Sequence, residues 1–579
     1  MEHVEIKLID EIDIEEIWKH LEFLCDIDRT SGTEGEYKSV SYIAEILKSY
    51  GIEVKIHEFS AYLSYPIWAQ IQTGDAKTIK AKTRAFSEST PEEGIEGEIV
   101  YIPGGDDMFT DTETVERIKS TDLAGKIVLS EGGGRQNMIM ARRMGAVGYI
   151  HLWPSDEDFI HEGIVTPIWG TPTPDNIDTC PNIPVVAVKR KDGLMLKEMA
   201  SRASTRIRLF TRVETTWRKL LLPEAIIPGK TKDFVLIGGH IDSWHLGATD
   251  NATGNVTCLE LARVLKLHQS ELIRGVRICW WPGHSTGRYA GSTWYCDHNW
   301  QDLRDHCVTY INIDSPGPLG AIDYSEVTMV AENDDLISSV VHEITGQRPQ
   351  PERPVRAGDQ SFWGPGITSA YMLLSNRPKE QRASVGGSGY GWWWHTEQDT
   401  IDKVERAVLH KDCKIYALTA YRLCTSGLLP LKVSSQAREL MEETIELEKA
   451  AKGVFDLTQS VSAAKRLYEI ASKFDEAAAG IAGSDSCSCT LDVANKAMLE
   501  AIKNLTPIRY SPEAPYEHGP AIPIEPIPML QPARKLATLD PGSDEFGFLK
   551  NWLVRRQNWV VRSMLVASRV LEAALKEMA

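Results

Sequence analysis

Residues 234–254 read FVLIGGHIDSWHLGATDNATG, an apolar run followed by a polar loop. Residues 234–237 and the two glycines after them are typical of a buried strand of a parallel sheet that ends at a loop. The next segment predicts a helix, because apolar residues recur at the i, i+3, i+4 and i+7 spacing of a buried face, at Cys258, Leu261, Ala262 and Leu265. Open α/β sheets bind ligands beyond the carboxyl ends of their strands, so we expect the chemistry in this loop.

The loop itself supplies an imidazole and two carboxylates. His240 follows the strand at once, Asp242 lies two residues later, and Asp250 comes just before the helix. An imidazole and a carboxylate suit a borderline-soft dication such as zinc, and a second carboxylate can hold the other ring nitrogen of the histidine. His240 and Asp250 are therefore candidate metal ligands, with Asp242 supporting His240. The alternative is a polar loop that only caps the helix.

Three other strand ends carry residues of the same kind. His284 follows the next predicted strand, Asp314 follows the one after it, and His395 lies farther along in a loop rich in Gly and Trp. Polar residues rarely fall at successive strand ends by accident, so the set favours one site built from four loops.

The composition and the periodicity of the sequence change along the chain. The strand–loop–helix pattern predicts an α/β domain, with a mixed, largely parallel sheet flanked by helices, from residues 1–69 and 216–429. Short β-like runs divided by Gly and Pro predict a β-rich domain inserted at 70–215. Helical patterns dominate 430–579, and the last of them carries Trp552 and Trp559 among more apolar residues than a lone helix needs.

Composition and charge exclude some partners. The 579 residues include 63 basic and 81 acidic side chains, a formal charge of −18. Nucleic acid and anionic membranes require clustered Lys and Arg, so neither is expected as a partner. The acidic first residues do not resemble a signal peptide and no run of 18 apolar residues occurs, which predicts a cytoplasmic protein. Its ten cysteines are expected as free thiols, with Cys487 and Cys489 in a solvent-facing turn.

Six segments resemble, in their order along the chain, the co-catalytic zinc aminopeptidases, in the branch of glutamate carboxypeptidase II and the transferrin receptor. They are GTEGE at 32–36, GGHIDSW with GATDNATG, AGSTWY, YINIDSPG at 310–317, AGDQSFW at 357–363 and WHTEQDTIDKV at 394–404. The resemblance implies that 70–215 is a protease-associated domain and 430–579 a dimerisation domain, and hence a homodimer. It further implies that His240, Asp250 and Asp314 bind one zinc ion, that Asp242 orients His240, and that Asp250 bridges to a second metal held partly by His395.

The sequence departs from the family at the turn after Trp281. The family has two glutamates there, a general base and a ligand of the second metal, and this chain has His284 and Ser285. With one carboxylate fewer, the second site should be weak, so one tightly held divalent metal is expected. An imidazole, whose reference pKa is ~6.5, can act as the base, so His284 is the candidate catalytic residue. Alternatives keep His284 as a metal ligand or as a packed histidine without a function, or give the missing role to His245 or Glu397.

These features predict a metal-dependent hydrolase that attacks an amide or related C–N bond of a small molecule or short peptide. The loop with Tyr390, Trp392, Trp393 and Trp394 is expected to form an aromatic wall for the substrate, the alternative being a core loop. A second hypothesis is a binding or scaffold protein that has kept the peptidase fold without catalysis.

Overall fold

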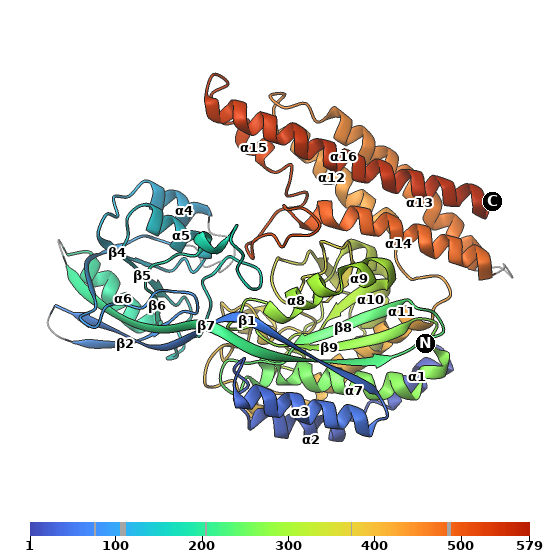
Figure 1. Cartoon of the computed structure of the whole chain (residues 1–579), viewed down its shortest axis with the longest axis horizontal. Coiled ribbons are helices and arrows are strands. Elements are labelled where there is room, and N and C mark those ends of the chain that lie inside the picture. Colours follow the sequence, from blue (N-terminus) through green and yellow to red (C-terminus); the bar gives the residue numbers. More distant parts are fainter. Residues whose placement is uncertain (75–76, 105–111, 203–204, 372, 483–487) are drawn as a thin grey trace.

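The computed structural model describes the chain except for residues 75–76, 105–111, 203–204, 372 and 483–487. Figure 1 shows three parts: a central α/β body, a lobe beside it, and a bundle of long helices above it. Among the described cysteines, eight are buried free thiols and Cys489 is exposed, whereas Cys487 lies outside the described residues.

The central body is built on five neighbouring strands of an eleven-stranded sheet, in the order β7, β9, β8, β10, β13. Their bounds are Arg206–Ile227, Gly275–Trp281, Phe234–His240, Cys307–Asn312 and Ser369–Ala370. The pairs β8–β9, β8–β10 and β10–β13 are parallel, and β7 is antiparallel to β9. Every residue of β8 is buried, as the unbroken apolar run predicts. The mixed, largely parallel sheet expected from the sequence is confirmed.

Helices cover both faces of this sheet. One apolar core packs α1 (His3–Asp10), α2 (Ile14–Cys25), α3 (Glu34–Ser49), α7 (Thr253–Leu267), α10 (Asp334–Thr345) and α11 (Arg406–Thr425) on one face. A second core holds α8 (Ala290–His298) and α9 (Trp300–His306) on the other. Figure 1 shows α2, α3 and α7 below the sheet and α8 and α9 above it.

Two long strands carry the chain from the body into the lobe (residues 74–205) and back. β1 (Glu53–Thr73) pairs antiparallel with β7 from Glu53↔Ile226 to Thr73↔Ile207. The lobe continues the same sheet, and both predicted domain boundaries, at 69/70 and 215/216, fall inside these strands.

The lobe itself contains strands and helices. Its strands are β2 (Thr78–Thr83), β3 (Ile95–Tyr101), β4 (Lys126–Ser130), β5 (Gly148–Leu152) and β6 (Val185–Val188), and β3 to β6 pair in parallel. Helices α4 (Thr112–Lys119), α5 (Arg135–Arg143) and α6 (Arg190–Ala200) accompany them. A two-stranded parallel sheet, β11 (Glu326–Thr328) with β12 (Gln350–Glu352), lies in the central body.

The C-terminal bundle consists of α12 (Val433–Ala450), α13 (Thr458–Ala482), α14 (Ser488–Tyr510), α15 (Pro532–Leu536) and α16 (Asp544–Met578). Helix α14 contains Pro507, which sits in its last turn. Among the described residues, none of the helices combines the length and apolar character that crossing a membrane requires.

Candidate active site

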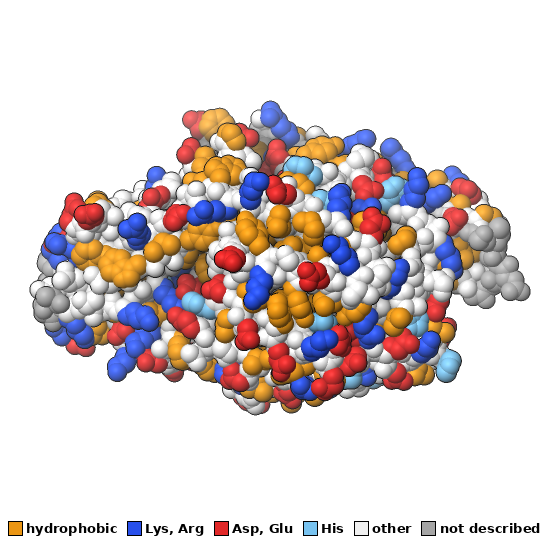
Figure 2. All heavy atoms as spheres, turned by 60° about the horizontal axis from the view of Figure 1, so that its bottom comes forward, with side chains coloured by type: hydrophobic (Ala, Val, Ile, Leu, Met, Phe, Trp, Pro, Cys, Tyr) orange, Lys and Arg blue, Asp and Glu red, His pale blue; other side chains and the backbone are white. Residues whose placement is uncertain are grey.

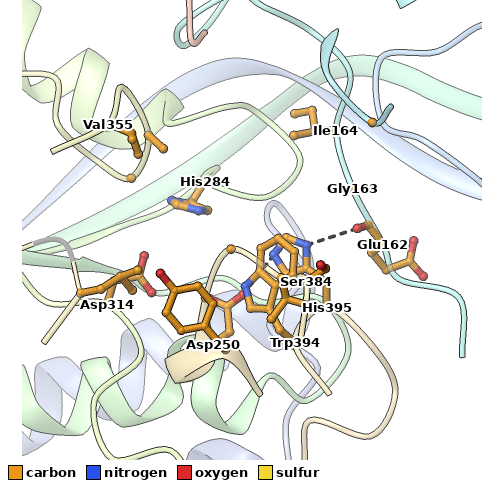
Figure 3. A pocket seen from close by; sticks show the side chains of 18 of the residues that line it. Glu162, Gly163, Ile164, Asp250, His284, Asp314, Val355, Ser384, Trp394 and His395 are labelled. Carbon is orange, nitrogen blue, oxygen red and sulfur yellow. Dashed lines mark hydrogen bonds and ion pairs between the residues drawn. The ribbon is translucent and has the colours of Figure 1, made fainter. Parts of the chain in front are cut away.

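The four loops that the sequence singled out converge at one edge of the sheet. His240 is the last residue of β8, His284 lies in the turn after β9, and Asp314 follows β10 by two residues. Asp250 lies between β8 and α7, and His395 in the loop after β13. Figure 3 shows the side chains of Asp250, His284, Asp314 and His395 around one cavity.

His240, Asp250 and Asp314 form a compact cluster. Their ligand atoms all lie within 4.8 Å of one another. His240 Nε2 is 2.9 Å from Asp250 Oδ1 and 3.8 Å from Asp314 Oδ1. Burial lowers the pKa of His240, but hydrogen bonds to Asp242, Asp250 and Asp314 outweigh it and hold this pKa well above the usual value. The cluster thus favours a positive charge between its carboxylates, and its donor set of one imidazole and two carboxylates fits a zinc ion.

Asp250 faces two histidines with its two oxygens. Oδ1 contacts His240, and Oδ2 lies 3.1 Å from His395 Nε2. Burial raises the pKa of Asp250, yet the hydrogen bonds with both histidines bring it well below the usual value. His395 Nδ1 lies 3.2 Å from the backbone oxygen of Glu162, in the lobe. A carboxylate between two imidazoles is the geometry of a bridging ligand, and on the His395 side the cluster shows no second carboxylate among the described residues.

Asp242 supports the site differently from the prediction. Its backbone oxygen, 2.9 Å away, is the close partner of His240 Nδ1, whereas its carboxylate oxygen is 3.7 Å from that nitrogen. The carboxylate instead accepts hydrogen bonds from the backbone N–H groups of His284, at 3.2 Å, and Ser285, at 2.8 Å. Asp242 lies in the loop after β8 and binds the turn after β9. It therefore holds that turn next to the cluster of candidate metal ligands.

His284 occupies the turn above the cluster. Its ring stacks on that of His240, with centroids 3.9 Å apart and planes 14° apart. Its Nδ1 is 2.8 Å from Oδ2 of Asp359, a buried carboxylate. Asp359 belongs to the AGDQSFW motif. It follows no predicted strand, so the sequence alone does not assign it a role. A search for carboxylates in every family-like motif could have found it.

The structure does not bring His245 and Glu397 to the metal cluster. They gather with Glu162 around the ammonium of Lys82, which lies 2.7 Å from Glu397 Oε1 and 2.8 Å from Glu162 Oε1. His245 Nε2 is 3.2 Å from the same Glu162 oxygen. A lysine thus provides the positive charge that these groups need. The side chain of Ser285 is buried and offers no carboxylate to the cluster.

The predicted wall of four aromatic residues is only half correct. Tyr390 and Trp394 line the cavity. Trp393 is 1% exposed and donates a hydrogen bond from its indole to Thr249 Oγ1, so it belongs to the core beneath the site. Trp392 stacks on Phe159 away from the cavity lining, with ring centroids 5.3 Å apart. Three consecutive residues cannot all face one side of a loop, and the sequence does not say which one does.

The cavity is rich in arginine. Its volume is about 620 Å³, and Arg84, Arg135, Arg288, Arg353 and Arg382 all contribute to its lining. This volume is that of a pocket for a small molecule. The lining comes from both the lobe and the central body.

Arg288 is buried and Arg135 is half-buried, and neither forms an ion pair with another described residue. The Nε atom of each has no hydrogen-bond partner in that part of the chain. Burial, with the nearby Arg288 guanidinium, lowers the pKa of Arg135 to about 9. Arg288 and Tyr289 have positive φ angles of 51° and 70°, a strained conformation. These angles set the direction of the backbone in the turn after β9. Uncompensated buried cations are costly unless an anion joins them.

Comparison with known proteins agrees with this geometry. Residues 224–419 match the model of peptidase family M28. The matched segment runs from the end of β7 into α11 and contains His240, Asp250, His284, Asp314 and His395. The probable lipoprotein aminopeptidase LpqL of Mycobacterium tuberculosis is 26% identical over 54% of this chain, and the chain spans 61% of that protein. The probable glutamate carboxypeptidase VP8 of Zea mays is 22% identical over 71% of this chain and 67% of its own length.

The fold also has relatives among solved structures. A zinc aminopeptidase from Bacillus subtilis, BSAP, superposes with a TM-score of 0.55 at 20% sequence identity, over 72% of this chain and 96% of its own. At this identity the likeness shows the shared fold. The family match and the named aminopeptidases and carboxypeptidases support a metallohydrolase.

Proposed function

We propose that the protein is a metallohydrolase that cleaves an amide or related C–N bond in a small molecule or short peptide. The single observation that carries this proposal is the placement of His284 directly over the ring of His240, at the mouth of the His240–Asp250–Asp314 cluster. A proton-accepting imidazole and a cation-binding cluster thus share one cavity.

The metal site consists of His240, Asp250 and Asp314, with His395 beside Asp250. A divalent metal bound there supplies Lewis acidity and lowers the pKa of water. The residues of this chain do the rest: the backbone oxygen of Asp242 holds Nδ1 of His240, so that its Nε2 faces the carboxylates. The likeness to a zinc aminopeptidase supports zinc as the metal.

His284 moves the protons of the reaction. Its Nδ1 is engaged by Asp359, so Nε2 is the atom free to accept a proton from the attacking water. Water oxygen bonds to the carbonyl carbon, the C–N bond breaks, and the same proton passes from His284 Nε2 to the leaving amine. Hydrolysis therefore needs no further reactant.

The substrate carries an anionic group near the scissile bond. Arg288 lies four residues after His284, and its guanidinium is 4.7 Å from the centre of the Tyr289 ring, which in turn lies 4.9 Å from the His284 ring. A carboxylate or similar anion would supply the hydrogen-bond acceptors that Arg135 and Arg288 lack. This charge requirement selects acidic amides among possible substrates.

The test is turnover by the zinc-loaded protein on amides that differ only in charge, such as amides and dipeptides of glutamate, glutamine and lysine. The proposal predicts hydrolysis of the acidic members, and loss of both bound metal and activity in His240→Ala. A zinc-bound protein that cleaves none of them would instead favour the binding or scaffold hypothesis.

A further inference from the structure

We propose that Asp359 is a positioning residue that fixes the tautomer of His284 and so leaves His284 Nε2 as the proton acceptor. This inference rests on the proposed function, because it explains how an imidazole can replace the glutamate base of the family. It adds a residue outside the metal cluster to the reacting machinery.

The carboxylate of Asp359 is engaged at both oxygens. His284 Nδ1 lies 2.8 Å from Oδ2, and Ser292 Oγ donates to Oδ1 at 2.7 Å. A carboxylate can only accept hydrogen bonds, so the hydrogen between it and the imidazole is carried by His284 Nδ1. A neutral imidazole with its hydrogen on Nδ1 has an acceptor lone pair on Nε2.

A chain of hydroxyl groups continues from Asp359. Ser292 Oγ lies 2.9 Å from Ser361 Oγ, and Ser361 Oγ accepts a hydrogen bond of 2.8 Å from the indole N–H of Trp169. Since the indole can only donate, Ser361 can donate to Ser292 and Ser292 to Asp359. Each hydroxyl group in the chain can therefore point its hydrogen toward the carboxylate.

The chain crosses between two parts of the molecule. Trp169 belongs to the lobe, Ser292 lies in α8, and Asp359 and Ser361 lie in the loop before β13. The Trp169 ring packs 4.5 Å from that of Tyr289, which borders His284. Trp169, a residue of the lobe, is thus the outermost member of the hydrogen-bonded series that orients the proposed base.

Asp359 is a better candidate for this role than Asp242. The Asp242 carboxylate contacts backbone N–H groups of the turn and fixes where the turn lies, whereas Asp359 contacts the ring nitrogen itself. Loss of a contact that orients a ring nitrogen should lower the reaction rate more than it lowers the stability of the fold. Replacing the carboxylate that orients a catalytic histidine by an amide can lower kcat by about 10⁴ in the serine-protease triad, where the wrong tautomer results.

The experiment compares Asp359→Asn and Asp359→Glu with the unmodified protein, using zinc content, kcat and KM. We expect Asp359→Asn to keep its zinc and its KM for the best acidic amide and to lose about 10²- to 10⁴-fold in kcat, with part of the loss restored in Asp359→Glu. Asp297→Asn is the matched control, because it breaks another His–Asp contact, with His518 at 2.8 Å, on the surface. Asp359→Asn with unchanged kcat overturns the proposal.

A second readout is independent of turnover. With ¹⁵N-labelled histidine, the signals of His284 are assigned by their absence in His284→Ala, and they report which ring nitrogen carries hydrogen. We expect the Nδ1–H form in the unmodified protein and its loss in Asp359→Asn; if that variant does not fold, the tautomer of the unmodified protein still decides. The Nε2–H form there overturns the inference, whereas absence of turnover together with the Nδ1–H form refutes only the proposed function.

Discussion

The imidazole rings of His284 and His240 lie parallel, 3.9 Å apart between centroids. One ring belongs to the proposed proton acceptor, and the other to a candidate metal ligand. Their stacking places the proton acceptor against the cluster without making it part of it: the ligand atoms that lie within 4.8 Å of one another belong to His240, Asp250 and Asp314. The stacking therefore favours a role of His284 as a general base over a role as a metal ligand.

The His395 side of the cluster should hold metal weakly. Asp250 is the carboxylate that faces His395, and Ser285 occupies the place of the second family glutamate. We expect close to one zinc equivalent per chain, and a rise toward two in Ser285→Glu, because the added carboxylate neutralises a second dication. Metal analysis of both proteins after equilibrium dialysis measures this. Two tightly bound equivalents in the unmodified protein would be inconsistent with this expectation.

The arginine pair should set substrate charge preference. In Arg288→Leu we expect KM for an acidic amide to rise by at least tenfold, since truncating one partner of a buried charged contact costs about 2–5 kcal/mol. A neutral amide of the same size serves as the internal control, and its KM should change little. Arg135→Leu should act in the same direction. Equal effects on both substrates would mean that the arginines are structural.

Acid should destabilise the lobe through His151. Burial, with the nearby Arg84 cation, lowers the pKa of His151 to about 3. Below pH ~6.5 the unfolded chain takes up a proton that the folded chain refuses until about pH 3, so the free energy of unfolding falls as pH drops through this window. The cost can reach about 1.4 kcal/mol per pH unit. We expect the melting temperature to fall less steeply between pH 7 and 5 in His151→Gln; equal slopes would contradict the assignment.

We also predict a homodimer formed through helix α16. Phe548 is 75% exposed and Trp552 is 36% exposed, and their i, i+4 spacing places them side by side on α16. The opposite side of α16 packs Leu553, Val560 and Leu571 into the core, so deleting 543–579 would expose that core and give an insoluble chain. Phe548→Asp is therefore the cleaner test, and it should convert a dimer to a soluble monomer in sedimentation. An unmodified protein that sediments as a monomer at micromolar concentration would exclude this interface.

The parts of the fold that were predictable are those whose signal is local. The run at 234–237 indicates β8 because continuous apolar residues between a turn and two glycines are typical of a buried parallel strand. The length of β1 was not predictable in this way. Its apolar alternation changes phase after Ile56 and is interrupted at Pro66, and Ile67 and Trp68 are exposed although they are apolar.

The same distinction between local sequence signals and long-range packing applies to the residues of the site. His240, Asp250, Asp314 and His395 could be found because each follows a strand end, and parallel strands bring their ends together. Asp359 lies in the AGDQSFW motif, but its contact with His284 could not be predicted from the sequence. The roles proposed for Arg135 and Arg288 depend on packing between the lobe and the body. The direction of Trp392, Trp393 and Trp394 depends on loop dihedral angles that no periodicity reveals.

The measurement that tests the central claim most directly is a zinc titration of the metal-free protein while hydrolysis of an acidic amide is followed. We predict that turnover is absent without metal, rises in proportion to bound zinc, and reaches its plateau near one equivalent per chain. Turnover that does not depend on zinc, or zinc binding at full occupancy without hydrolysis of any acidic or neutral amide, would contradict a metallohydrolase.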